Sequence, residues 1–93
     1  MASDEPGTEL SLQVFPNPVS SSTIVSFSLE NSQKVSLSIL DMSGRFVAAL
    51  ADKIFEAGEN KLVWNAEEAN AGIYFLQFQS AENLQTEKLI VAK

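Results

Sequence analysis

The side chains of this chain that could do chemistry are mainly carboxylates and serines. An adjacent acidic pair, Glu67–Glu68, is a first candidate for acid–base work. Two carboxylates that act together on a glycosidic bond must both face it, whereas side chains next to each other in sequence point in different directions on a strand or a helix. The pair is therefore better interpreted as part of a solvated loop.

The serines lack the partners that a catalytic serine requires, namely a general base and an oxyanion hole. The chain has no histidine and no cysteine, it contains no G-x-S-x-G segment, and Ser43 merely precedes a turn glycine. A Ser–Lys dyad stays open on spacing alone. Without cysteine and histidine, disulfides and thiolate or imidazole metal sites are excluded. We therefore expect a protein that is not an enzyme and has no cofactor.

Calcium is the metal that this chain could hold through oxygen ligands alone. Asp41 with backbone oxygens near Gly44 is one candidate site, and Asp52 with Glu56 is another. Neither reproduces the D-x-[DN]-x-[DN]-G spacing of a calcium loop. We expect no metal site, and weak calcium binding is left as the alternative.

The chain is acidic, with a net charge of −6 and six basic residues that are scattered along the sequence. Nucleic acids and anionic lipid surfaces attract basic patches, so we expect neither as a partner. The 93 residues suffice for one domain. The apolar runs are far shorter than the roughly 20 residues of a membrane-spanning helix.

The N-terminal segment MASDEPGTEL is polar and acidic, and it lacks the basic and apolar regions of a signal peptide. Its first three residues are typical of an expression leader. We interpret residues 1–10 as a disordered linker remnant of a longer protein and residues 11–93 as the folded domain.

Alternation of apolar and polar residues dominates the rest of the chain and predicts strands with one buried and one solvated face. Residues 23–30 and 34–40 show it most clearly, with expected core positions Val25, Phe27, Leu29, Val35, Leu37 and Ile39. Further strands are expected at 12–15, 46–50, 61–65, 72–79 and 86–92. Apolar residues on both faces of 72–79 predict a central strand. The last strand is expected at a sheet edge, with unpaired backbone groups free for β-augmentation.

Glycine and proline separate these strands. Gly44 and Gly58 are expected in tight turns, where glycine tolerates positive φ. The segment 66–72 is the one place for a short helical turn. Two prolines between the first strands each fix φ and remove a donor, which predicts a stiff extended corner. The structural motif positions are Pro16, Asn17, Pro18, Asp41, Gly44 and Gly58.

About seven short strands separated by regular turn signals are typical of a β-sandwich. We therefore predict an all-β fold, an Ig-like antiparallel sandwich. Most of the aromatic residues must fill its core, and Phe55 and Phe75 are the ones expected to be partly exposed. Such exposed aromatics would suit a carbohydrate-binding module, which, with a passive Ig-like spacer, is the alternative function.

Five blocks follow one another along the chain: FPNPV (Phe15–Val19), LDMSGRFV (Leu40–Val47), AGENKLVW (Ala57–Trp64), AGIYFLQF (Ala71–Phe78) and EKLIVAK (Glu87–Lys93). Their order and spacing resemble the type A C-terminal sorting domain of the type IX secretion system of Bacteroidetes, over residues 12–93. One departure is Phe15, where the family usually has tyrosine. An Ig-like family related to the flagellar hook-capping protein is also similar in its G-x-Y turn.

The resemblance implies a delivery function. Family members lie at the C-terminus of secreted cargo, which reaches the periplasm by an ordinary signal peptide and then the cell surface or the medium. The implied partners are the type IX translocon, its outer-membrane shuttle protein, the N-terminal cargo domain and a sortase-like cysteine protease that usually removes the sorting domain. Exposed edge strands also permit dimerisation or strand swapping of the isolated domain.

The resemblance places the recognition signal in the C-terminal blocks, at Gly72, Tyr74, Leu76, Lys88, Ile90 and Lys93. The alternative roles are structural: backbone geometry for the glycine, core packing for the tyrosine and leucine, and protection against edge-to-edge aggregation for the lysines. Processing is expected before the first strand, where exposed chain is open to a protease. That region is Glu5, Pro6, Gly7, Thr8, Glu9 and Leu10.

Overall fold

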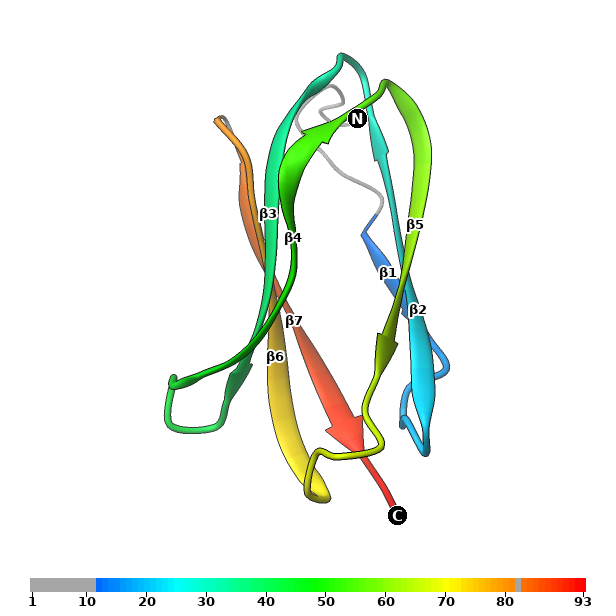
Figure 1. The fold of residues 1–93 in the computed structure, drawn as a ribbon, viewed down its shortest axis with the longest axis vertical. Coiled ribbons are helices and arrows are strands. Elements are labelled where there is room, and N and C mark those ends of the chain that lie inside the picture. Colours follow the sequence, from blue (N-terminus) through cyan, green and yellow to red (C-terminus); the bar gives the residue numbers. More distant parts are fainter. Residues whose placement is uncertain (1–11, 82) are drawn as a thin grey trace, which may run out of the picture.

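A computed structural model of the chain describes residues 12–81 and 83–93, which form two facing sheets (Figure 1). The strands are β1 (Gln13–Phe15), β2 (Ser22–Leu29), β3 (Gln33–Asp41), β4 (Phe46–Phe55), β5 (Gly58–Asn65), β6 (Gly72–Gln79) and β7 (Leu84–Val91). One sheet has the order β1-β2-β5 and the other β4-β3-β6-β7, and all neighbouring strands are antiparallel. The predicted sandwich of about seven strands is confirmed, with β6 inside its sheet and β7 at an edge.

The alternating apolar residues pack between the two sheets. The six core positions expected on β2 and β3 are all 0–7% exposed. On β6, Tyr74, Leu76 and Phe78 are buried, while the residues between them are half-buried on the outer face. The period of two in the sequence therefore translates directly into one inner and one outer face for each of these strands.

Three phenylalanines join the two sheets at the centre of the core. The ring of Phe27 on β2 lies edge-on to Phe55 on β4, with 5.2 Å between centroids, and to Phe78 on β6, with 5.4 Å. Edge-to-face pairs of this kind add to the stabilisation by burial. Phe55 is only 6% exposed, so the expectation that it is partly exposed is wrong, and with it the sugar-binding role suggested for its ring.

Strand β4 explains that error. The strand runs to Phe55, past its expected end at residue 50. Its pairing with β3 contains two register shifts, opposite Leu37/Ser38 and Ile39/Leu40. Such bulges add a residue to one strand and interrupt the alternation of inward and outward side chains. The sequence pattern of β4 is therefore weak, and the strand predicted from it is too short. As the last residue of a strand, Phe55 points into the core instead of lying in a loop.

The connections are tight. Gly44 and Gly58 have φ of +88° and +103°, and an added Cβ would meet no atom within 4 Å at either. Glycine is needed there for its backbone freedom alone, as the sequence predicted for Gly44. Between β5 and β6, the N–H of Ala69 donates to the carbonyl of Ala66 at 3.0 Å in a turn. The helical turn expected there does not form, and residues 12–81 and 83–93 contain no helix.

Candidate functional site

Strand β7 and the surface beside it form the candidate site, because most of the expected recognition positions lie on β7 or on its neighbour β6. Strand β7 pairs with β6 along its whole length, from Gln79↔Leu84 to Gly72↔Val91. Leu89 and Val91 are 0% and 2% exposed, whereas Lys88 and Ile90 project outward. The C-terminal half of β7 therefore packs alternate side chains into the core and exposes the others to solvent.

The Pro-Asn-Pro corner closes part of the free edge of β7. The Asn17 side-chain amide donates to the carbonyl of Lys88, and its carbonyl oxygen accepts from the N–H of Ile90, both at 3.0 Å. Two residues on, the Val19 N–H donates to the Ile90 carbonyl at 2.7 Å and the Val19 carbonyl accepts from the Ala92 N–H at 2.9 Å. We call Asn17 and Val19 the β7 latch.

Further contacts hold the latch in position. Val19 is fully buried and forms a parallel bridge with Val91. The buried hydroxyl of Thr23 donates to the carbonyl of Pro16 at 2.8 Å, and both peptide bonds that precede Pro16 and Pro18 are cis. The stiff corner predicted from the prolines is thus also a pairing element for the C-terminal strand.

The latch contradicts the expectation that the backbone groups along the outer edge of the last strand are all free for β-augmentation. Residues with even numbers on β7 direct their backbone groups away from β6, since Ile90 and Ala92 bond to the latch. The carbonyl of Lys88 and both backbone groups of Ile90 are therefore already paired. Among the described residues, the outer edge open to an added strand is limited to the N-terminal part of β7, around Leu84 and Thr86.

Three of the six expected recognition residues present no side chain at the surface. Leu76 is fully buried in the core. The Tyr74 hydroxyl donates to the carbonyl of Asn70 at 2.7 Å, which is the bond of a tyrosine corner at the start of an Ig-like strand, and its ring packs edge-on to Trp64 at 6.0 Å. Gly72 has φ of +154°. The side chains of Tyr74 and Leu76 therefore face inward, and the exposed Gly72 presents backbone alone.

Tyr74→Phe tests this structural role. Removing the hydroxyl leaves the partly buried carbonyl of Asn70 without its donor, and we expect the free energy of unfolding to fall by about 1 kcal/mol. Urea denaturation of both proteins measures the difference. An unchanged midpoint would show that the hydroxyl has no structural part, and would favour a role in recognition.

The other three residues lie at the surface. Lys88 stands opposite Phe75 of β6, and Ile90 stands opposite Ile73. The ammonium of Lys93 donates to the backbone carbonyl of Glu67, so the end of the chain is tied to the turn between β5 and β6. The structure therefore brings Lys88 and Ile90 together on one outer face and places Lys93 beside it.

Asp41 organises the turn between β3 and β4. One carboxylate oxygen accepts from the hydroxyl and the N–H of Ser43, at 2.7 and 2.9 Å, and from the N–H of Arg45 at 2.9 Å. The hydrogen bond from the Ser43 hydroxyl is the main cause that holds the pKa of Asp41 below its ordinary value of 3.8, with the Arg45 N–H next. The carboxylate is thus occupied as a turn acceptor.

The lowered pKa of Asp41 predicts a loss of stability in acid. Because its pKa is lower in the folded than in the unfolded state, the ionised carboxylate stabilises the fold above pH about 4, and this contribution disappears as the pH falls through the folded-state pKa. Urea denaturation of both proteins at several pH values between about 2.5 and 7 tests this. The free energy of unfolding should fall less in acid for Asp41→Asn than for the unsubstituted chain. Identical pH profiles would contradict this role.

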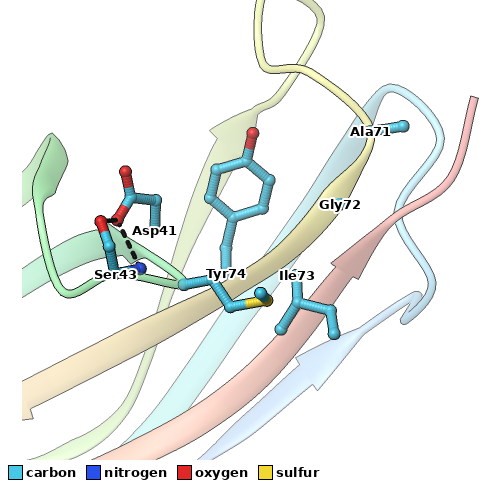
Figure 2. A pocket seen from close by; sticks show the side chains of 7 residues that line it. Asp41, Ser43, Ala71, Gly72, Ile73 and Tyr74 are labelled. Carbon is cyan, nitrogen blue, oxygen red and sulfur yellow. Dashed lines mark hydrogen bonds between the residues drawn. The ribbon is translucent and has the colours of Figure 1, made fainter.

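A shallow surface pocket of about 340 Å³ lies between the Asp41 turn and the start of β6. Figure 2 shows Asp41 and Ser43 on one side, Ala71 and Gly72 on the other, and the Tyr74 ring between them. Neither this pocket nor any other part of residues 12–81 and 83–93 gathers three metal-ligating side chains. At the second calcium candidate, Asp52 accepts from the hydroxyl of Ser36 and pairs with Lys34 at 3.6 Å.

A family model described as the secretion system C-terminal sorting domain matches residues 13–92, nearly the whole folded part. The chain belongs to this family, the C-terminal sorting domains of the type IX secretion system. A comparison with curated proteins finds no match. The matched range includes the latch and the whole of β7, so Lys88 and Ile90 lie within it, whereas Lys93 is one residue beyond its end.

Membership of the family gives the general function of the domain. Sorting domains are signals and not catalysts, and the protein that carries one is exported. In the part of the chain that the structure describes, no helix has the length and hydropathy needed to cross a membrane.

Proposed function

We propose that the export machinery reads this sorting domain as a folded unit, through the outward residues of β7. The observation that carries the proposal is the β7 latch, which fixes the position of Lys88 and Ile90 although β7 is an edge strand. A fixed edge strand presents the same side chains to every receptor. In this proposal the export machinery contacts Lys88, Ile90 and Lys93. The other three residues, Gly72, Tyr74 and Leu76, maintain the structure of the domain.

The receptors in this proposal are the type IX translocon and its outer-membrane shuttle protein, as for type A domains of Bacteroidetes. The N-terminal cargo of the parent protein passes through the periplasm to the cell surface or the medium. A sortase-like cysteine protease then cuts between Glu5 and Leu10 and removes the domain. This segment and the linker assignment for residues 1–10 lie outside the described residues, so support comes from the resemblance and from the first strand beginning at Gln13.

Export of a reporter tests which residues are read. Deleting residues 88–93 would remove the buried Leu89 and Val91 and unfold the domain, so substitutions are the sharper test. With a signal peptide and a reporter in front, Lys88→Gln combined with Lys93→Gln should lower the surface fraction of the reporter several-fold in a host with a type IX system. Lys34→Gln combined with Lys61→Gln is the matched control for lost positive charge and should be exported normally.

Mass spectrometry of the exported reporter locates the cut. Ends between Glu5 and Leu10 that depend on the sortase-like protease of the host support the proposed processing. Normal export of the Lys88/Lys93 variant would refute the assignment of the read residues, and a cut inside residues 12–93 would refute the processing site.

A further inference from the structure

Strand β7 without its latch would offer a straight pairing edge to another molecule. The strand has eight residues and pairs with β6 without a register shift, whereas β4, at the other edge of the same sheet, is interrupted by two shifts. Unpaired N–H and C=O groups along a straight edge pair readily with a strand of a second molecule. On β7 these outward groups belong to the residues with even numbers.

The latch occupies this edge in the manner of a parallel strand. Val19 donates to the Ile90 carbonyl and accepts from the Ala92 N–H with its own backbone, as a residue in a parallel pair does. Asn17 repeats the pattern two residues earlier, at the Lys88 carbonyl and the Ile90 N–H, but with its side chain. The carboxamide has the donor and the acceptor of a peptide group. It therefore takes the place of a peptide group in the ladder.

The far side of the latch is not a new pairing edge. A strand added to a sheet normally leaves its own outward backbone groups free for the next strand. Pro16 and Pro18 have no N–H, and the Val19 N–H already donates to β7. The Pro16 carbonyl accepts from the Thr23 hydroxyl at 2.8 Å. The N–H of Asn17 is then the one backbone donor left in this segment, so the latch ends the sheet instead of extending it.

We propose that the latch is an autoinhibitory contact, which keeps β7 from pairing with β7 of a second copy of this chain. Two copies related by a two-fold axis bring the same edge together in antiparallel directions, and all neighbouring strands within the two sheets pair in that way. With the latch in place, the open edge is confined to the stretch around Leu84 and Thr86. Without the Asn17 side chain, it extends through Lys88 to the N–H of Ile90.

This role of the latch does not depend on which residues the export machinery contacts. It also limits the dimerisation that exposed edge strands would permit, because a pair formed through the stretch around Thr86 alone has few backbone hydrogen bonds. Two exported copies of the domain therefore stay separate while Lys88 and Ile90 remain at the surface.

Self-association of the purified chain, measured by sedimentation equilibrium, tests the role of the latch. Asn17→Ala should self-associate at least about tenfold more tightly than the unsubstituted chain, because neither copy then gives up the two Asn17 hydrogen bonds on pairing. Adding Thr86→Pro to Asn17→Ala should reverse this effect. Proline removes an N–H that faces away from β6, a change that the edge of a sheet tolerates.

Tyr74→Phe is the matched control for lost stability. It removes a hydrogen bond to the carbonyl of Asn70 and leaves both latch residues in place. It should self-associate no more tightly than the unsubstituted chain. A difference between this variant and Asn17→Ala therefore reports on the edge of β7 and not on general destabilisation.

Hydrogen exchange locates the interface. In concentrated Asn17→Ala, the amides of Thr86 and Lys88 should be more protected than in the dilute variant. Circular dichroism shows whether the variant with Thr86→Pro folds, and the exchange measurement decides the question if it does not.

Three results would overturn the inference. The first is an Asn17→Ala variant that associates no more tightly than the unsubstituted chain. The second is association of Asn17→Ala that leaves the amides of Thr86 and Lys88 unprotected or that persists in the folded variant with Thr86→Pro. The third is equal association of Tyr74→Phe, which would attribute the effect to lost stability.

Discussion

Phe27→Ala is expected to lower the free energy of unfolding by about 3–5 kcal/mol. The Phe27 ring is 1% exposed and contacts Phe55 and Phe78 across the two sheets, so its removal leaves a cavity at the centre of the only core that the described residues form. The stability of a domain of this size is of order 5–10 kcal/mol. The substitution therefore removes at least about a third of it.

Thermal unfolding measures the effect, because each kcal/mol shifts the midpoint of such a domain by about 4–8 °C. Phe46→Ala is the matched control: it removes the same ring from a position that is 64% exposed, and it should change the stability by no more than about 0.5 kcal/mol. A midpoint for Phe27→Ala within a few degrees of the unsubstituted chain would contradict the packing described for the core.

Asn17→Ala is expected to open the C-terminal half of β7. The substitution removes two hydrogen bonds, to the Lys88 carbonyl and from the Ile90 N–H. Because both bonds are exposed and water can replace them, we expect a loss of about 1–2 kcal/mol. The more specific consequence is local: the amide of Ile90 loses its acceptor, and exchange with solvent at that position should become faster than elsewhere in the sheet.

Hydrogen exchange by NMR resolves this effect from general destabilisation. The amides of Ile90 and Ala92 should lose protection in Asn17→Ala, while those that bond β3 to β6 should keep it. Asn31→Ala, at an exposed position in the turn between β2 and β3, should leave both sets unchanged. Equal loss of protection across both sheets, or unchanged exchange at Ile90, would show that the side chain of Asn17 does not hold β7.

Local patterns in the sequence were sufficient to predict the layers of this fold. Alternation gave the buried faces of β2 and β3 because the side chains of a strand point to opposite faces in turn. Gly44 was predictable since few other residues tolerate a positive φ in a tight turn. Apolar residues on both faces correctly placed β6 inside its sheet, although Ile73 and Phe75 on its outer face are half-buried and lie outside the core.

Contacts between distant residues were not predictable in the same way. Asn17 and Lys88 are 71 residues apart, and nothing in the Pro-Asn-Pro segment itself indicates that its asparagine pairs with the last strand. Phe55 was misjudged because the bulges of β4 interrupt the alternation on which the prediction relied. The outer row of Phe46, Leu40 and Phe75 comes from three strands, so it becomes visible only when the register of the sheet is known.

The most direct measurement of the central claim is surface delivery of a reporter that carries this folded domain at its C-terminus. The reporter should reach the surface of a host with an intact type IX system, remain in the periplasm of the same host without its translocon, and remain there also when the domain carries Phe27→Ala. Equal surface delivery with and without the translocon, or by the destabilised Phe27→Ala variant, would contradict the account.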